Sequence, residues 1–185
     1  MSELKELAAE AKHELLTHII PFWRGMRDDK FGGYYGYLSY DLALDEKAEK
    51  GCILNSRITW FFANAYLLYK DSGISEEECE AAGFKGEDLL AEAKHGYEFL
   101  REHCIDKEYG GIFWSLNYDG TPLDTTKHTY NQAFCIYALS SYYDAAGDKE
   151  ALELAFSLFD IIEERCTDEI GYCEVYDRPA NGTDF

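Results

Sequence analysis

One segment of the sequence, KHTYNQAFCIYALSSYY at residues 127–143, limits the fold more than any other. Its length is that of a helix, and beyond its first turn it is apolar on nearly every side. The polar residues His128, Tyr130, Asn131 and Gln132 gather at its start. A helix that is apolar all round is normally buried, and buried polar groups need a partner. The segment therefore predicts an inner helix whose polar end faces a cavity, a ligand or another part of the protein.

Amphipathic helices alternate with this buried type along the chain. Apolar residues recur at steps of three and four over residues 4–22, 86–103 and 148–165, which is the pattern of helices with one face in water. The first of these helices is expected to end at Pro21 and the residues after it, because proline interrupts a helix. A second segment, NSRITWFFANAYLLY at residues 55–69, is apolar nearly all round. Outer and inner helices are therefore expected to follow one another in turn.

The segments that lead toward the inner helices share a glycine-rich pattern. DDKFGGYYGYLSYD at 28–41, DKEYGGIFWSLNYDG at 106–120 and DEIGYCEVYD at 168–177 each place glycine before alternating aromatic residues. This pattern predicts a tight turn and a short β-hairpin. The chain is therefore interpreted as an internal repeat of amphipathic helix, glycine-containing hairpin and buried helix.

The repeat indicates which positions of the two inner helices are equivalent. Aligning the glycines that follow the helices pairs Arg57 with Asn131. The same alignment pairs Trp60 with Phe134. Polar groups are thus expected to recur at the starts of both inner helices.

Outer amphipathic helices around inner apolar ones suit an all-α toroidal barrel, in which an outer ring shields an inner ring. The hairpin loops would gather at one mouth of the ring, so the polar end of 127–143 is expected to line a pocket there. Residues 1–185 are expected to form a single domain, the N-terminal part of such a barrel, because the third unit stops before a sixth helix. An incomplete ring exposes an apolar face, which predicts self-association.

Composition narrows the classes of partner. With 17 basic and 36 acidic residues the formal net charge is −19, which disfavours nucleic acid and anionic membranes. The six cysteines form no CxxC pair, so no metal site is expected and reduced thiols are favoured. No segment approaches the roughly 20 apolar residues of a membrane span, and the N-terminus has no signal-peptide pattern. These features predict a cytoplasmic protein, and they leave open a neutral or cationic small molecule as its partner.

Four segments carry a resemblance to a known family: ELLTHIIPFWRGMRDDKFGGYYGYLSYD, LNSRITWFFANAYLLY, CIDKEYGGIFWS and KHTYNQAFCIYALSSYY. They resemble the N-terminal half of the N-acylglucosamine 2-epimerase family, and within it the cellobiose 2-epimerase branch. The resemblance implies an (α/α)6 barrel that interconverts reducing-end glucose and mannose at C2. It implies cellobiose or a related disaccharide as the substrate, and no metal or nucleotide cofactor.

The chemistry implied by the resemblance assigns roles to residues. Epimerisation at C2 removes the proton next to the aldehyde and returns it to the opposite face of an enediolate, so two bases are needed, and histidine suits this role. In the family these histidines lie on later inner helices, outside this chain. Arg57 matches the family's inner-helix arginine at the reducing end of the sugar. Tyr130 and Asn131 are expected to face the same pocket.

Each of these residues also has a simpler interpretation. Arg57 follows good N-cap residues and is compatible with a surface position, although a cation at a helix start opposes the helix dipole. Asn131 is equally compatible with capping a neighbouring loop. His128, Trp60 and Trp114 are further candidates for sugar contact, although aromatic residues at helical spacing are usually part of the core.

Other functions stay open at this level. An N-acylglucosamine 2-epimerase or an aldose–ketose isomerase of the same family is one alternative. A second is a glycoside hydrolase built on an α/α toroid, which needs paired carboxylates, whereas the equivalent positions here hold Arg57 and Asn131. A third is a non-catalytic helical scaffold that binds a protein, for which polar groups at buried helix starts have no evident use.

Overall fold

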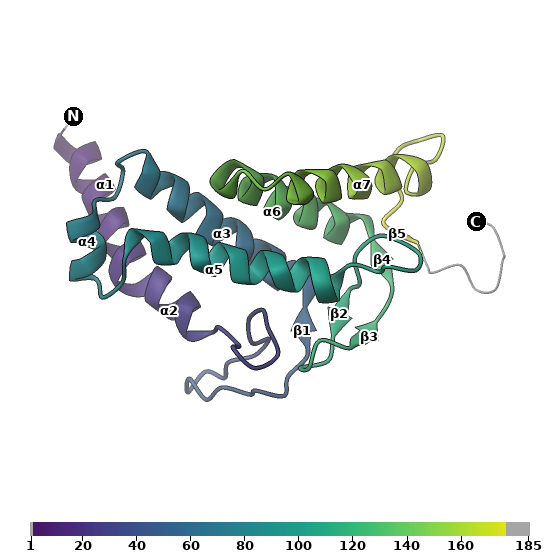
Figure 1. Ribbon diagram of the computed structural model, residues 1–185, viewed down its shortest axis with the longest axis horizontal. Coiled ribbons are helices and arrows are strands. Elements are labelled where there is room, and N and C mark those ends of the chain that lie inside the picture. The colour runs from purple at the N-terminus through teal and green to yellow at the C-terminus, as the bar shows by residue number, and fades with distance from the viewer. Residues whose placement is uncertain (1, 177–185) are drawn as a thin grey trace.

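The computed structural model describes residues 2–176, which form a layer of antiparallel helices with their strand-containing loops gathered along one side (Figure 1). The helices are α1 (Ser2–Glu14), η1 (Leu15–Ile19), α2 (Ile20–Gly25), α3 (Cys52–Lys70), α4 (Glu76–Ala81), α5 (Gly86–Phe99), η2 (Leu100–Cys104), α6 (Thr129–Ala146) and α7 (Lys149–Arg165). The strands are β1 (Lys50–Gly51), β2 (Ser115–Leu116), β3 (Pro122–Asp124), β4 (Lys127–His128) and β5 (Val175–Tyr176). Among the described residues no helix is long and apolar enough to cross a membrane.

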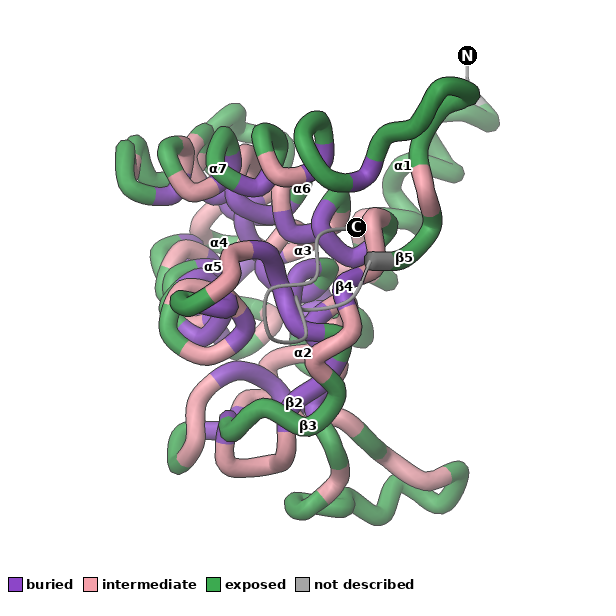
Figure 2. The backbone as a smooth tube through the Cα atoms, turned by 90° about the vertical axis from the view of Figure 1, so that its right-hand side faces the viewer, coloured by how far each residue is buried: buried purple, intermediate pink, exposed green. Residues whose placement is uncertain are grey.

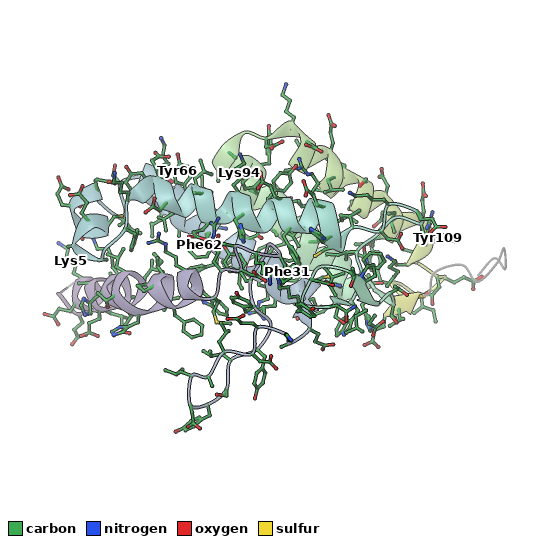
Figure 3. The ribbon with its side chains drawn as sticks, turned by 60° about the horizontal axis from the view of Figure 1, so that its bottom comes forward. Lys5, Phe31, Phe62, Tyr66, Lys94 and Tyr109 are labelled. Carbon is green, nitrogen blue, oxygen red and sulfur yellow. The ribbon has the colours of Figure 1, made fainter. Side chains whose placement is uncertain are left out.

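The two inner helices are α3 and α6, as the all-round apolar segments predicted. Helix α3 packs against both α5 and α6, and α6 packs against α7. Figure 2 shows the buried residues concentrated where these helices meet. Figure 3 shows the same division for side chains, with Lys5 and Lys94 pointing outward and Phe62 held inside. The alternation of outer and inner helices is therefore confirmed.

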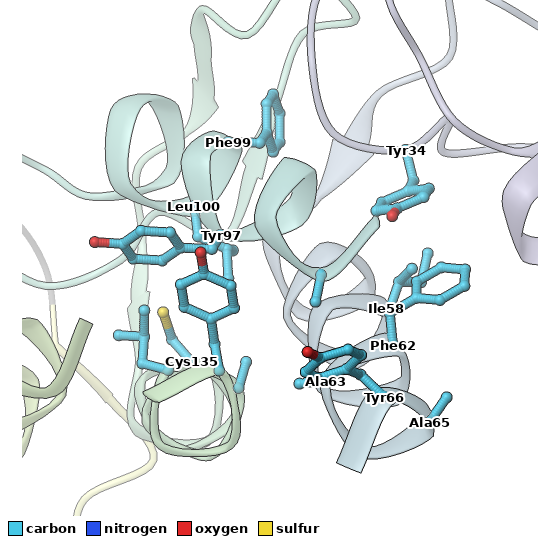
Figure 4. Close-up of a cluster of buried hydrophobic side chains, with 14 of the residues drawn as sticks. Tyr34, Ile58, Phe62, Ala63, Ala65, Tyr66, Tyr97, Phe99, Leu100 and Cys135 are labelled. Atoms are coloured by element: carbon cyan, nitrogen blue, oxygen red, sulfur yellow. The ribbon is translucent and has the colours of Figure 1, made fainter. Parts of the chain in front are cut away.

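The core lies between α3, α5 and α6 (Figure 4). Phe62 of α3 stacks on Tyr34 of the first loop at a centroid distance of 6.0 Å, and Tyr97 of α5 stacks on Tyr142 of α6 at 4.4 Å. All four side chains are buried. The aromatic residues thus join the helices to one another and to the first loop.

The first helix does not end at Pro21, contrary to the prediction. The chain stays helical to Gly25, because the five-residue π-helical segment η1 precedes the proline and the N–H of Ile20 bonds to the carbonyl of Leu15. Pro21 therefore occupies the first turn of α2. A proline is tolerated there, since its missing N–H is one that a first turn leaves unbonded.

The glycine-rich loops form the predicted tight turns, and an antiparallel bridge closes a short hairpin in each loop: Arg27 with Tyr34, Ile105 with Ile112, and Thr167 with Tyr172. The second loop holds a further hairpin, β2 with β3. Pairings between successive loops, which the pattern did not predict, join β1 to β2 and β4 to β5. Two-residue strands are too short to be stable alone, and pairing between loops ties the repeated units together.

The same turn opens all three loops. Asp28, Asp106 and Asp168 each accept hydrogen bonds from two backbone N–H groups, located two and three residues later, through Oδ1. Gly33 follows the first of these turns with φ +65°, and a Cβ there would lie 2.6 Å from Oδ1 of Asn55. Glycine is therefore required at this position for both its backbone conformation and its lack of a side chain.

The structure corrects the register of the internal repeat. Asn55 of α3 and Gln132 of α6 each accept a hydrogen bond from a backbone N–H of the preceding loop, at 2.9 and 2.8 Å. These equivalent bonds pair Asn55 with Gln132, which pairs Arg57 with Phe134 instead of Asn131. The glycine-based alignment was wrong by about one turn because the helices end differently. Helix α6 has a left-handed glycine at its C-cap, whereas α3 ends at an aspartate.

Candidate functional site

A cavity of about 1040 Å³ lies beside the N-terminal halves of α3 and α6. Helix α3 supplies the longest part of its wall and α6 the facing part, while α2 and two loops complete it. Every tryptophan of the sequence lines this cavity. The lining residues are Trp23, Glu49, Gly51, Ile53, Leu54, Arg57, Ile58, Trp60, Phe61, Trp114, Ser115, Ala133, Phe134 and Tyr137.

Arg57 is the cation of this lining. Its side chain leaves the second turn of α3, and its guanidinium carbon lies 5.6 Å from the centre of the Phe134 ring on α6. Within residues 2–176 it forms no hydrogen bond or ion pair through its side chain. Its N–H donors therefore stay available to a ligand in the cavity, and hydrogen bonds from a charged donor are stronger than those from a neutral one.

Aromatic rings form the flat surfaces of the cavity. Trp60 of α3 stacks on Tyr137 of α6 with centroids 4.7 Å apart and planes 17° from parallel. Trp114, on the loop that holds β2, contacts the ring of His128 at 4.1 Å. Aromatic faces of this kind pack well against the C–H groups of a sugar ring. The cavity therefore combines the guanidinium of Arg57 with surfaces suited to a pyranose.

The structure places Tyr130 and Asn131 outside the cavity lining. Tyr130 is exposed, and its ring meets the edge of Phe134 at a centroid distance of 4.7 Å. Asn131 is fully buried, and its Nδ2 donates to the carbonyl of Phe113 at 2.6 Å. Gln132 beside it also bonds to loop backbone. The polar start of α6 thus serves the preceding loop, while Arg57 on α3 reaches the cavity.

No histidine is among the described residues that line the cavity. His128 comes nearest, through its contact with Trp114. His95 and His103 on the outer helices form hydrogen bonds with loop carbonyls, at 2.8 and 3.3 Å. His18 pairs with Glu14 one turn away on the surface. His95 and His103 thus hold loop backbone against the outer helices, and His18 lies at the surface.

Sequence reasoning missed four aromatic residues of the cavity, namely Trp23, Phe61, Phe134 and Tyr137. Phe61 and Tyr137 lie on the inner helices, and the corrected repeat contains a signal for Tyr137, because it is the equivalent of Trp60. Trp23 comes from α2, and nothing in its local sequence indicates that it faces the same space. A site assembled from three helices and two loops is difficult to predict from a linear pattern.

The charged side chains of the cavity wall limit the chemistry that the wall can perform. Glu49 is the carboxylate among the described lining residues, opposite in sign to Arg57. Within residues 2–176 no group of three or more His, Cys, Asp or Glu side chains is arranged to hold a metal ion. The described wall thus offers hydrogen bonding, electrostatic stabilisation and apolar contact.

The chain is similar to known proteins over most of its length. A family model described as N-acylglucosamine 2-epimerase matches residues 33–181. Cellobiose 2-epimerase from Ruminococcus albus is 54% identical over 172 residues, which are 93% of this chain and 40% of that protein. The structure of cellobiose 2-epimerase from Bacillus thermoamylovorans superimposes with a TM-score of 0.84 at 38% identity, covering 94% of this chain and 42% of that one.

A more distant structure shares the fold alone. A family 76 glycoside hydrolase (mannosidase) from Bacteroides thetaiotaomicron superimposes with a TM-score of 0.58 at 20% identity, over 81% of this chain and 34% of that one. The chain therefore has the helix arrangement of an α/α toroid, and it spans about 40% of the length of the cellobiose 2-epimerases it matches.

Proposed function

Because this chain belongs to the N-acylglucosamine 2-epimerase family, we propose that it forms the arginine-bearing side of a sugar 2-epimerase site. The substrate is the reducing-end glucose of cellobiose or a related disaccharide. The similarity to cellobiose 2-epimerases over 93% of the chain supports this choice within the family. The resemblance seen in the four sequence segments is confirmed by the family match.

Arg57 acts in this proposal by stabilising charge. Removing the proton at C2 of the open-chain sugar produces an enediolate, and negative charge develops on the C1 oxygen. A fixed donor close to that oxygen lowers the barrier, because it stabilises the transition state more than the ground state. The unpaired guanidinium above the Phe134 ring supports this role. Its planar fork of donors suits an oxygen pair such as that of an enediolate.

The aromatic surfaces bind the rings of the substrate. The Trp60–Tyr137 stack and Trp114 border the same cavity as Arg57. Packing of a pyranose on these faces would orient the reducing end toward the guanidinium. Stacking on the aromatic rings thus orients the sugar, and the charge of Arg57 stabilises the enediolate.

Proton transfer is assigned to groups other than the described lining residues. None of those residues is a histidine, and their carboxylate is Glu49. The chain is therefore expected to bind sugar and polarise it without exchanging the C2 proton. A hydrolase mechanism is not supported either, since it needs two carboxylates across the scissile bond.

The observation that carries the proposal is an arginine with free donors in a cavity lined by all the tryptophans of the chain. Tryptophan emission of the purified chain is therefore a direct reporter of the cavity. We expect a saturable change on titration with cellobiose. Methyl β-cellobioside, whose reducing end is blocked, should bind more weakly. A titration without saturable change would contradict sugar binding at this cavity.

A second measurement tests the division of roles. Cellobiose is incubated with the chain in heavy water, and the C2 proton of the reducing-end glucose is followed by proton NMR. We expect the signal to persist as in a sample with heat-inactivated protein. Loss of the signal would show that this chain itself carries the acid and base groups.

A further inference from the structure

We propose that two buried lysine–aspartate pairs, Lys50–Asp28 and Lys127–Asp106, position α3 and α6 against each other and so set the geometry of the sugar cavity. The inference rests on the proposed function for its sugar-binding consequence. These four residues do not line the cavity. They are positioning residues, which act through the helices that follow them.

The first pair connects the first loop with the start of α3. The Nζ of Lys50 lies 2.6 Å from Oδ2 of Asp28 and 2.7 Å from the carbonyl oxygen of Gly32. Both charged side chains are essentially inaccessible to solvent, at 0% and 1% exposure. Lys50 opens β1, and α3 begins two residues later. The ammonium group therefore fastens the start of α3 to the aspartate turn.

The second pair repeats this arrangement at α6. The Nζ of Lys127 lies 3.0 Å from Oδ2 of Asp106, and both side chains are again buried. Lys127 opens β4, and α6 begins two residues later. In both loops the aspartate uses Oδ1 for its own turn and Oδ2 for the lysine. The same device thus precedes each inner helix.

The cavity contacts fall at matching positions beyond the two lysines. Arg57 lies seven positions after Lys50, and Phe134 lies seven positions after Lys127. These two residues are in contact, with the guanidinium over the ring. Trp60 and Tyr137 lie ten positions after their lysines, and they form the stacked pair. Contacts across α3 and α6 therefore depend on the axial placement of both helices.

Strand pairing connects the first lysine with the second loop. Lys50 pairs with Leu116, and Gly51 pairs with Ser115. A shift of the first pair would therefore move α3 relative to the loop that leads to α6. Gly51 and Ser115 both line the cavity, so the same shift changes its wall directly.

Stability alone does not explain these ion pairs. A buried ion pair loses the hydration of two charges, and replacing both partners by uncharged residues is often neutral or stabilising. Removing one partner is strongly destabilising, because it leaves the other charge buried alone. Replacing both partners of one pair therefore tests the effect on helix position without leaving a buried charge unpaired.

The experiment compares four proteins: the unchanged chain, Lys50→Met, Asp28→Asn/Lys50→Met and Leu158→Ala. In the double variant, the asparagine that replaces Asp28 keeps an Oδ1 for the turn. Leu158 is a core residue of α7 that does not line the cavity, so Leu158→Ala is a control for lost stability. Three readouts are recorded: the melting temperature, the near-ultraviolet circular dichroism of the aromatic stack, and the cellobiose titration of tryptophan emission.

We expect Lys50→Met to lower the melting temperature and the double variant to recover most of it. The double variant should nevertheless show an altered near-ultraviolet spectrum and a Kd for cellobiose weakened by about tenfold. Leu158→Ala should melt earlier with an unchanged spectrum and affinity. Affinity that recovers together with melting temperature in the double variant would overturn the positioning role.

The same experiment distinguishes a failure of the proposed sugar binding from a failure of the positioning role. If the unchanged chain shows no response to cellobiose, sugar binding is refuted while the circular dichroism still tests positioning. An unaltered aromatic spectrum in the double variant would then refute positioning, and an altered spectrum would support it.

Discussion

Replacing Arg57 by alanine tests the assignment of the cavity most directly. The side chain is exposed, and it contacts the ring of Phe134 at 5.6 Å. An exposed cation–π contact contributes about 0.5–1 kcal/mol to stability. Its loss is partly offset because a cation near a helix start opposes the dipole. For a domain of this size we therefore expect the melting temperature to fall by no more than about 2–4 °C.

The expected effect on sugar binding is much larger. A hydrogen bond from a charged group contributes about 1.5–3 kcal/mol, so Arg57→Ala should weaken cellobiose binding by about 10- to 150-fold. In a full-length enzyme, loss of one such donor should lower kcat/KM by about 10²–10³. Arg57→Lys should recover only part of the affinity, because an ammonium group does not reproduce the planar fork of donors.

The assay is the cellobiose titration of tryptophan emission, with thermal melts of the same samples. Arg101→Ala is a matched control, because the Arg101 guanidinium also lies 5.6 Å from a ring centre, that of Tyr97, and does not line the cavity. The control should keep its sugar affinity. If Arg57→Ala binds cellobiose normally and melts several degrees earlier, the arginine is structural and the site is misplaced.

Four further predictions follow from the packing and the charges. Gly33→Ala should lower the free energy of unfolding by about 2–4 kcal/mol, through backbone strain and overpacking. Gly83 also has a positive φ but lies in open space, so Gly83→Ala should lower it by only about 1–2 kcal/mol. Urea unfolding measures both values. Burial raises the pKa of Asp28, but hydrogen bonds from Lys50 and from the backbone outweigh it and hold the pKa below the ordinary value of an aspartate. Because the folded pKa is depressed, this stabilisation is full above the unfolded pKa and is lost as the pH falls through the folded one. Thermal melts should therefore show a drop below about pH 4 that is smaller in Asp28→Asn/Lys50→Met. Ellman's reagent should label Cys173 rapidly in the folded chain, because the other five cysteines are buried. It should label all six cysteines only after the chain unfolds. The exposed rings of Phe156 and Phe159 on α7 should promote self-association, which light scattering would detect as a concentration-dependent mass, and Phe156→Ser/Phe159→Ser should reduce it.

Local periodicity made the helical framework predictable. The segments 55–69 and 127–143 are α3 and α6, since a helix without a polar face has to be covered on all sides. The error at Pro21 has a local cause, because a proline rule applied to an α-helix does not anticipate a preceding π-helical segment. The error in the repeat register arose from treating two different helix ends as equivalent.

The sequence by itself determined the alternation of inner and outer helices, the aspartate–glycine turns between them and the place of Arg57 on an inner helix. These features depend on residues close together in the chain. The tertiary structure alone decided that Asn131 bonds to the Phe113 carbonyl, that strands pair between loops and that Trp23 joins the cavity. The physical reason is that a polar side chain bonds to whichever backbone group folding brings within reach, and that group belongs to a distant part of the chain.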